Sequence, residues 1–144
     1  MPKKTVFSIA ILAFTMAASA AYAQYGMPPP TTAPATSGVT RTILQNIAFP
    51  GDGYATVQAY NVIAPGATVA RHTHPGIEVG YVLEGEGDFT VQGEPTKHLK
   101  AGESFVNPNS VPHGAHNTSL DKPLKVLSVY VVDKSKPLAT AAPQ

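Results

Sequence analysis

The chain has 144 residues, ten lysines and arginines against nine aspartates and glutamates, a formal net charge of +1 at pH 7, and no cysteine. The lack of cysteine excludes disulfides, cysteine nucleophiles and thiolate metal ligands, so any metal must be held by nitrogen and oxygen. A near-neutral chain with two arginines has no strongly basic surface for nucleic acid or anionic lipid, and we expect neither partner.

The first 23 residues have the layout of a secretory signal peptide. A basic start, MPKK, precedes an apolar run, VFSIAILAFTMAA, and Ala21 and Ala23 stand at the A-x-A positions of a cleavage site. The apolar run is short for a transmembrane helix, although an uncleaved anchor helix is the alternative. Cleavage after Ala23 would make Gln24 the first residue and would change the formal charge from +1 to −1. We therefore predict an exported protein, periplasmic or extracellular, with no membrane attachment after signal cleavage.

The remaining sequence divides into three parts by composition. Residues 24–39 are rich in proline, threonine and alanine and are predicted to be a linker that buries little apolar surface. Residues 133–144, DKSKPLATAAPQ, are predicted to be a flexible C-terminal tail. Residues 40–132 remain as one folded domain, which is large enough to have a hydrophobic core.

Within this domain, short runs of aromatic and β-branched residues alternate with Gly and Pro turns. No window of twelve residues has the apolar spacing of an amphipathic helix. We expect strands at residues 41–49, 54–64, 67–74, 77–85, 88–93, 96–100, 103–108 and 124–133. This spacing predicts an all-β sandwich or barrel.

Two histidines on the third of these strands are the first candidates for chemistry. Residues i and i+2 of a strand face the same side, so His72 and His74 should point together, with Cα atoms ~6.6 Å apart. A turn at Pro75 and Gly76 could bring Glu78 back beside them. Two neutral nitrogens and one carboxylate suit a divalent cation. The pair alone is equally consistent with two ordinary surface histidines.

A second group of histidines lies in PNSVPHGAHN, residues 108–117. His113 follows a proline and precedes a glycine, and it becomes a fourth ligand if strand pairing brings this segment beside the first. His116 lies three residues later, and a histidine at such a position is more often solvated than bound to a metal. His98, in the polar stretch KHLK, is expected on the surface.

These two segments together resemble the paired signatures of the cupin family. The first signature reads Gly, five residues, His-x-His, three or four residues, Glu, six residues, Gly, and it is matched by Gly66, His72, His74, Glu78 and Gly85. The second reads Gly, five residues, Pro-x-Gly, two residues, His, three residues, Asn, and it is matched by Gly102, Pro108, His113 and Asn117. One position departs, because Ser110 stands where the pattern has glycine.

The resemblance is to small single-domain, type-2-like cupins. It implies a single jelly-roll β-barrel, and it implies that one divalent metal ion is held inside the barrel by His72, His74, Glu78 and His113. Such a set leaves one or two coordination positions open for water, dioxygen or a ligand. Iron, manganese, nickel, copper and zinc all suit these ligands.

Two functions of different classes remain open, with a storage or structural barrel as a third. The first is a metal-dependent enzyme acting on a small molecule, such as an oxygenase (for example a dioxygenase), an isomerase or a lyase. The second is a non-catalytic module that binds a metal or a small ligand.

The candidate acids or bases beyond the metal are His116 and Tyr81. The candidate pocket walls are Tyr60, Tyr81, Phe89, Phe105 and Val106. We also expect a homodimer, because strands 88–93 or 124–133 could form an exposed edge.

Overall fold

The computed structural model describes residues 37–49 and 53–143. The predicted signal peptide, most of the linker and most of the turn at residues 50–53 lie outside the described residues. The described part consists of strands and loops, and no segment of it forms a helix that is long and apolar enough to span a bilayer. Its strands are β1 (Val39–Ala48), β2 (Tyr54–Ile63), β3 (Thr68–Thr73), β4 (Gly76–Glu84), β5 (Glu86–Val91), β6 (Lys97–Lys100), β7 (Ser104–Asn107), β8 (His113–Asn117), β9 (Leu124–Asp133) and β10 (Thr140–Ala141).

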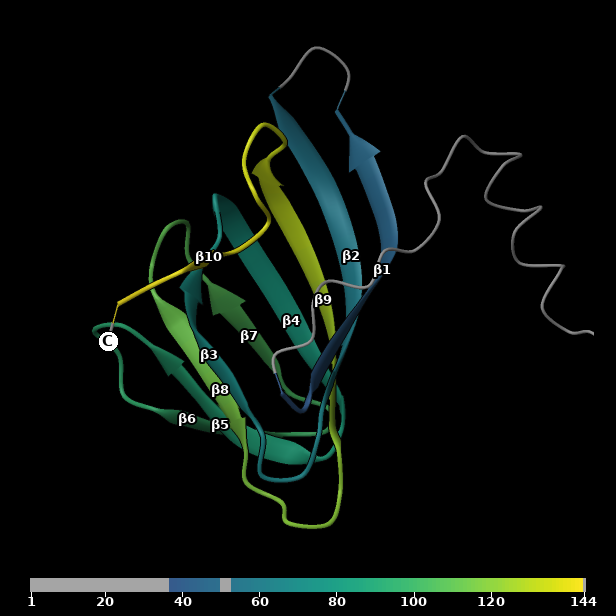
Figure 1. Ribbon diagram of the computed structural model, residues 1–144, viewed down its shortest axis with the longest axis vertical. Helices are drawn as coiled ribbons and strands as arrows, with labels where there is room; N and C mark the ends of the chain where they lie inside the picture. Colours follow the sequence, from purple (N-terminus) through teal and green to yellow (C-terminus); the bar gives the residue numbers. More distant parts are fainter. Residues whose placement is uncertain (1–36, 50–52, 144) are drawn as a thin grey trace, which may run out of the picture.

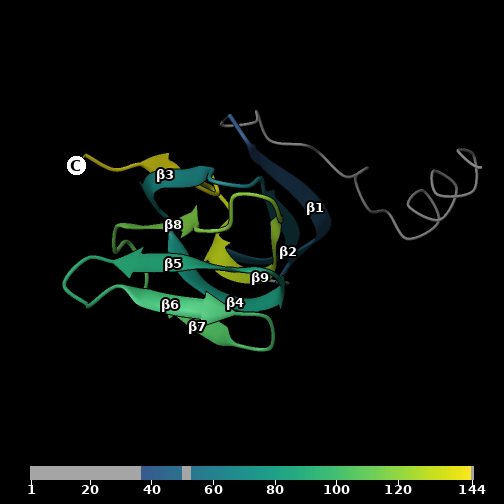
Figure 2. The same cartoon turned by 90° about the horizontal axis from the view of Figure 1, so that it is seen from below.

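The strands form two antiparallel sheets that face each other (Figures 1 and 2). One sheet has the order β1-β2-β9-β4-β7, and the other has the order β10-β3-β8-β5-β6. The chain passes from one sheet to the other after β2, β3, β4, β6, β7, β8 and β9. This is the jelly-roll arrangement, and the predicted all-β fold is confirmed.

Buried and more exposed residues alternate strictly along β2 and β9, and the buried ones form much of the barrel interior. Every second residue of β9 is buried from Leu124 to Val132, and the same holds for β2 from Ala55 to Ile63. The buried apolar side chains form two clusters, one with Ile63, Val82, Phe89, Leu124 and Val126 and the other with Val57, Ala59, Tyr130 and Val132. On β9, the buried polar Ser128 lies between the two clusters, and on β2 Asn61 does the same. A polar layer therefore crosses the barrel between two apolar ends.

The residues after β9 differ from the sequence prediction. The tail predicted from residue 133 onward instead lies along β3, where Thr140 pairs with Thr73 and Ala141 pairs with His72 (Figure 1). The amide of Ala142 donates to the carbonyl of Arg71 at 3.1 Å, and Leu138 packs against the second apolar cluster. This segment is rich in polar residues and contains prolines, yet it contacts the barrel through the side chain of Leu138 and through backbone pairing with the edge of β3.

The outer face of β4 is apolar. Ile77, Val79, Tyr81 and Leu83 all point outward and are 45–46% exposed. Exposed apolar rows of this kind often form interfaces between proteins. The homodimer expected from the sequence stays a prediction. The strands expected to form an exposed edge for it do not do so, because β5 lies between β8 and β6 and β9 lies between β2 and β4.

Ser110, the one position that departs from the cupin signatures, has an unfavourable backbone conformation. Ser110 has φ of 61°, the only positive φ among the described non-glycine residues. Its amide donates to the carbonyl of His74 at 3.0 Å, which joins the loop before β8 to the end of β3. A side chain in the left-handed region is unfavourable by ~1–2 kcal/mol.

We expect Ser110→Gly to stabilise the protein by about 0.5–1 kcal/mol. Removing the left-handed strain outweighs the extra chain entropy that glycine gives to the unfolded state. Urea unfolding of the purified protein measures the change. Ser104→Gly, on β7 at a position with ordinary φ, is the matched control and should be destabilising. Equal destabilisation by both substitutions would show that the turn does not strain Ser110.

Candidate metal centre

A β-bulge places the first two histidines on the inside of the barrel. Across β3 and β8, Val69 pairs with Ala115 and His72 pairs with His113, so β3 has one extra residue between these pairs. The extra residue reverses the alternation of side chains, and both Val69 and His72 face the cavity. His74 follows two residues after His72 and is 1% exposed. The predicted common face of His72 and His74 is therefore confirmed.

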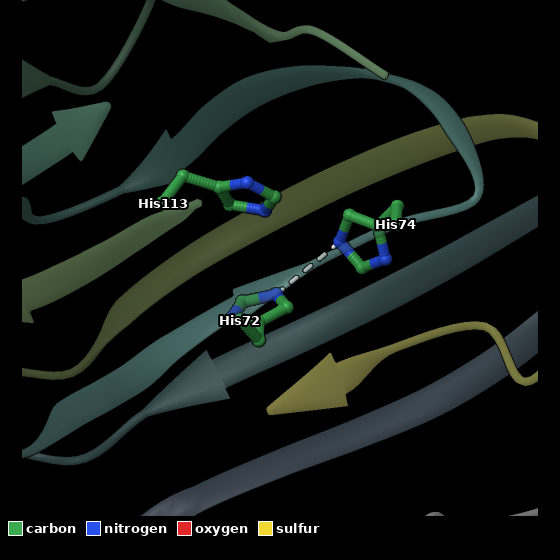
Figure 3. Close-up of side chains that lie close together, drawn as sticks. All are labelled: His72, His74 and His113. Atoms are coloured by element: carbon green, nitrogen blue, oxygen red, sulfur yellow. Dashed lines mark hydrogen bonds between the residues drawn. The ribbon is translucent and has the colours of Figure 1, made fainter. Parts of the chain in front are cut away.

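His113 and Glu78 complete the group from two further strands. His113 lies at the start of β8, opposite His72, and its ring centroid is 4.4 Å from that of His72 and 4.9 Å from that of His74. Glu78 points inward from β4 in the opposite sheet and is 5% exposed. Its Oε2 atom lies 3.3 Å from Nε2 of His74 and 3.5 Å from Nε2 of His113. Figure 3 shows the three imidazoles pointing toward one another.

Backbone carbonyls fix the orientation of all three rings. Nδ1 of His72 lies 2.8 Å from the carbonyl of Ala70, and Nδ1 of His113 lies 2.8 Å from the carbonyl of Val111. Nδ1 of His74 lies 2.5 Å from the carbonyl of Leu138, in the C-terminal segment. A carbonyl can only accept, so each Nδ1 carries the proton and donates it. Each neutral ring then presents the bare lone pair of Nε2 to the centre of the group, which is the tautomer that binds a metal.

With all three rings in this neutral tautomer, the group contains no positive charge beside the carboxylate of Glu78. Nε2 of His72 and Nε2 of His74 are 3.2 Å apart, as the dashed line in Figure 3 marks. With both Nδ1 atoms protonated, this contact brings two lone pairs together. Nε2 of His113 is buried and has no hydrogen-bond partner within the described residues. A cation at the centre would satisfy all three nitrogens, and these three histidines form a group that could hold a metal ion.

The charge states of Glu78 and His72 agree with a metal site made of one carboxylate and three imidazoles. Burial by itself would raise the pKa of Glu78, but its close contacts with the imidazoles of His113 and His74 and its hydrogen bond from Asn107 hold the pKa well below its ordinary value, so the carboxylate is ionised. Nδ2 of Asn107 donates to Oε2 of Glu78 at 2.8 Å. Burial lowers the pKa of His72 to about 4, and the neighbouring His113 and His74 act in the same direction. His72 is thus neutral at pH 7, as a ligand must be.

A cavity of about 50 Å³ opens onto His72, His113 and Glu78. One water molecule needs ~10–15 Å³ of such space, so the cavity has room for a few heavy atoms beside a metal ion. On its floor, Gly80 leaves space for Phe105, because a Cβ at Gly80 would lie 2.1 Å from that ring. The lining residues are Val39, Arg41, Asn61, Ile63, Val69, His72, Glu78, Phe89, Phe105, Asn107, His113, Gly114, Ala115, Val126, Ser128 and Tyr130.

Several side chains proposed from the sequence lie elsewhere. Phe89 and Phe105 line the cavity as predicted, whereas Tyr60, Tyr81 and Val106 do not. Tyr81 is 46% exposed on the outer face of β4, three residues from Glu78 and therefore on the opposite side of the strand.

His116 is also on the outside. It lies three residues after His113 on β8, so its side chain points to the opposite face of the strand. Its Nδ1 lies 3.0 Å from Oγ1 of Thr68 on the outer surface. Tyr81 and His116 both lie outside the cavity, and a catalytic role for either stays a prediction that this position does not favour. His98 lies on the surface as expected, with Nδ1 2.8 Å from Oδ1 of Asp88.

Sequence reasoning missed a group of polar cavity residues. Tyr130 packs its ring 4.7 Å from that of His74, and burial raises the pKa of its hydroxyl, with the charge of Glu78 adding to the effect. Arg41, Asn61, Asn107 and Ser128 also line the cavity. Asn61 and Ser128 could have been found from the sequence, because each is a polar residue at an inward-facing position of a strand whose other inward-facing residues are mostly apolar.

Comparison with known proteins identifies the class to which this fold and site belong. The family model for the cupin domain matches residues 59–130, which are half of the chain and include all four candidate ligands. The chain belongs to the cupin family. An RmlC-like cupin from Shewanella frigidimarina superposes with a TM-score of 0.58 and 26% identity, over 73% of this chain and 86% of that one.

Two curated proteins are similar to part of this chain. Dimethylsulfoniopropionate lyase DddQ of Ruegeria pomeroyi is 30% identical over 76 residues, which are 52% of this chain and 37% of that protein. The HTH-type transcriptional regulator PuuR of Escherichia coli is 41% identical over 61 residues, which are 42% of this chain and 32% of the regulator. The chain therefore spans about a third of the length of each of these relatives.

Proposed function

We propose that this cupin binds one divalent transition metal ion through His72, His74, His113 and Glu78 and that it acts on a small molecule in the adjoining cavity. The observation that supports this most strongly is the convergence of three Nε2 lone pairs on one ionised, buried carboxylate. Removing these groups from water without a cation is unfavourable. Iron, manganese, nickel, copper and zinc all suit three imidazoles and one carboxylate.

A metal ion bound here would supply Lewis acidity toward a ligand or bound water. The protein's own residues prepare the site for it. Carbonyls of Ala70, Val111 and Leu138 keep the imidazoles in the ligating tautomer. Asn107 orients Glu78. The apolar walls exclude bulk water and strengthen every electrostatic interaction inside the cavity.

The reaction class that we favour is that of a metal-dependent enzyme, such as an oxygenase, an isomerase or a lyase. The similarity to a lyase supports this choice. The alternative is a module that binds a metal or a small ligand without turnover, and the similarity to a transcriptional regulator supports it. The cavity contains a buried phenol, Tyr130, beside a ligand histidine, and this is a proton-carrying group that a pure binding site does not need.

A screen of small molecules against the metal-loaded protein separates the two functions. The enzyme hypothesis expects consumption of a substrate, or substrate-dependent oxygen uptake, that disappears when the metal is removed by a chelator. Full metal occupancy together with ligand binding and no turnover would instead establish the binding module. Tyr130→Phe should reduce turnover in the first case and leave ligand affinity nearly unchanged in the second.

We further propose that the protein is exported, to the periplasm or beyond, because residues 1–23 have the layout of a signal peptide. Expression of the full chain followed by N-terminal sequencing of the envelope and medium fractions tests this. We expect Gln24 at the new N-terminus. An intact N-terminus in the cytosolic fraction would contradict export.

A further inference from the structure

Arg41 places a positive charge in the wall of the cavity. It extends from β1, and its Nε donates to Oδ1 of Asn61 at 3.0 Å. Nδ2 of Asn61 in turn donates to Oγ of Ser128 at 3.1 Å. The Cζ atom of Arg41 lies 5.9 Å from the centroid of the Tyr130 ring. The partly buried guanidinium is therefore positioned by Asn61 and the Tyr130 ring, and Ser128 in turn accepts from Asn61.

The charge of Arg41 has no counter-ion in the described part of the chain. No carboxylate oxygen of residues 37–49 or 53–143 forms an ion pair with it. Its Nε–H is used by Asn61, and the four N–H groups on its two Nη atoms form no side-chain hydrogen bond within the same residues. A partly buried cation without a partner is unfavourable. With a divalent cation beside Glu78, the site as a whole would be strongly positive.

We propose that the cavity takes a small organic carboxylate, with its carboxylate group on the Nη edge of Arg41 and its apolar body against the walls. This inference rests on the proposed function and narrows it to a substrate class. The planar fork of a guanidinium matches the two oxygens of a carboxylate. The walls favour an organic body over inorganic phosphate, because they include Val39, Val69, Phe89, Phe105 and Val126.

Calorimetric titration of the mature protein with butyrate, butyramide and inorganic phosphate tests the proposal. Butyramide has the shape of butyrate without its charge. The variants are Arg41→Gln, which removes the charge, and Arg41→Lys, which keeps the charge but removes the fork. The matched control is Arg71→Gln, because Arg71 donates to Gln92 and does not line the cavity. Metal content is measured for every variant.

We expect the wild type to bind butyrate about tenfold or more tightly than butyramide, since hydrogen bonds to charged groups are among the stronger ones. Arg41→Gln should lose about tenfold in butyrate affinity and most of the preference over butyramide, with its metal content unchanged. Arg41→Lys should lie between the two. Arg71→Gln should stay within about twofold of the wild type.

Three results would overturn the inference. The first is equal binding of butyrate and butyramide by the wild type. The second is a preference that survives Arg41→Gln, because the metal alone would then select the acid. The third is tighter binding of phosphate than of butyrate. A protein that lacks metal but binds butyrate in an Arg41-dependent way would refute the proposed metal site and leave the carboxylate site standing.

Discussion

His72→Ala should lower the affinity for a divalent transition metal by about 100-fold or more and leave the β-sheet circular-dichroism spectrum unchanged. Loss of a residue that merely orients a ligand costs ~10–100-fold in affinity, and loss of a ligand should cost at least as much. The fold should survive, because neither apolar cluster includes His72 and its ring is only partly buried. Equilibrium dialysis followed by elemental analysis measures the affinity.

His98→Ala is the matched control for this prediction. His98 is on the outer surface, and its partners there are Asp88 and Glu86. Its removal should change neither the metal affinity nor the spectrum. If His98→Ala and His72→Ala had the same affinity as the wild type, metal binding would not involve the interior histidines.

Acid should destabilise the metal-free protein through His72. Burial lowers the pKa of this imidazole from 6.5 to about 4 in the folded state. Between pH 6.5 and pH 4, the unfolded chain binds a proton at residue 72 that the folded chain does not bind. The free energy of unfolding therefore falls as the pH is lowered through this window. We expect residue 72 to account for about 2 kcal/mol of the loss, after allowance for the partial exposure of the ring.

Urea unfolding at a series of pH values, with a chelator present, measures this loss. His72→Gln has no titrating group at this position, so the difference between wild type and variant isolates the contribution of residue 72. Glu78 acts in a separate range, because its lowered pKa means that its contribution is present above pH 4.5 and is lost only at lower pH. Parallel pH profiles for wild type and His72→Gln would contradict the assigned burial of His72.

The strands that sequence analysis found are those with a clear apolar alternation. The sequence YATVQAYNVI of β2 and LKVLSVYVVD of β9 bury every second residue, and both were predicted within a residue or two. The sequence HGAHN of β8 was not predicted as a strand, although it lies in the middle of its sheet between β3 and β5. Its pairing is determined by neighbours that are distant in sequence, so no local pattern reveals it.

The candidate ligands were easier to predict than the other residues of the cavity. His72 and His74 share a face by strand geometry, and the family signatures added His113. The carbonyl of Leu138 could not be predicted, because its contact with His74 spans 64 residues and lies in a segment of polar composition. Arg41 was missed for the same reason, since it enters the cavity from β1 through a contact with Asn61, 20 residues away.

The central claim is that three Nε2 atoms and one carboxylate hold a metal ion inside the barrel. The most direct measurement is X-ray absorption spectroscopy combined with elemental analysis of the mature protein, produced without a histidine tag. We predict about one divalent transition metal ion per chain, with imidazole nitrogens at ~2.0–2.1 Å if the metal is zinc. A protein that holds no metal, even after incubation with iron, manganese, nickel, copper and zinc in turn, would contradict the claim.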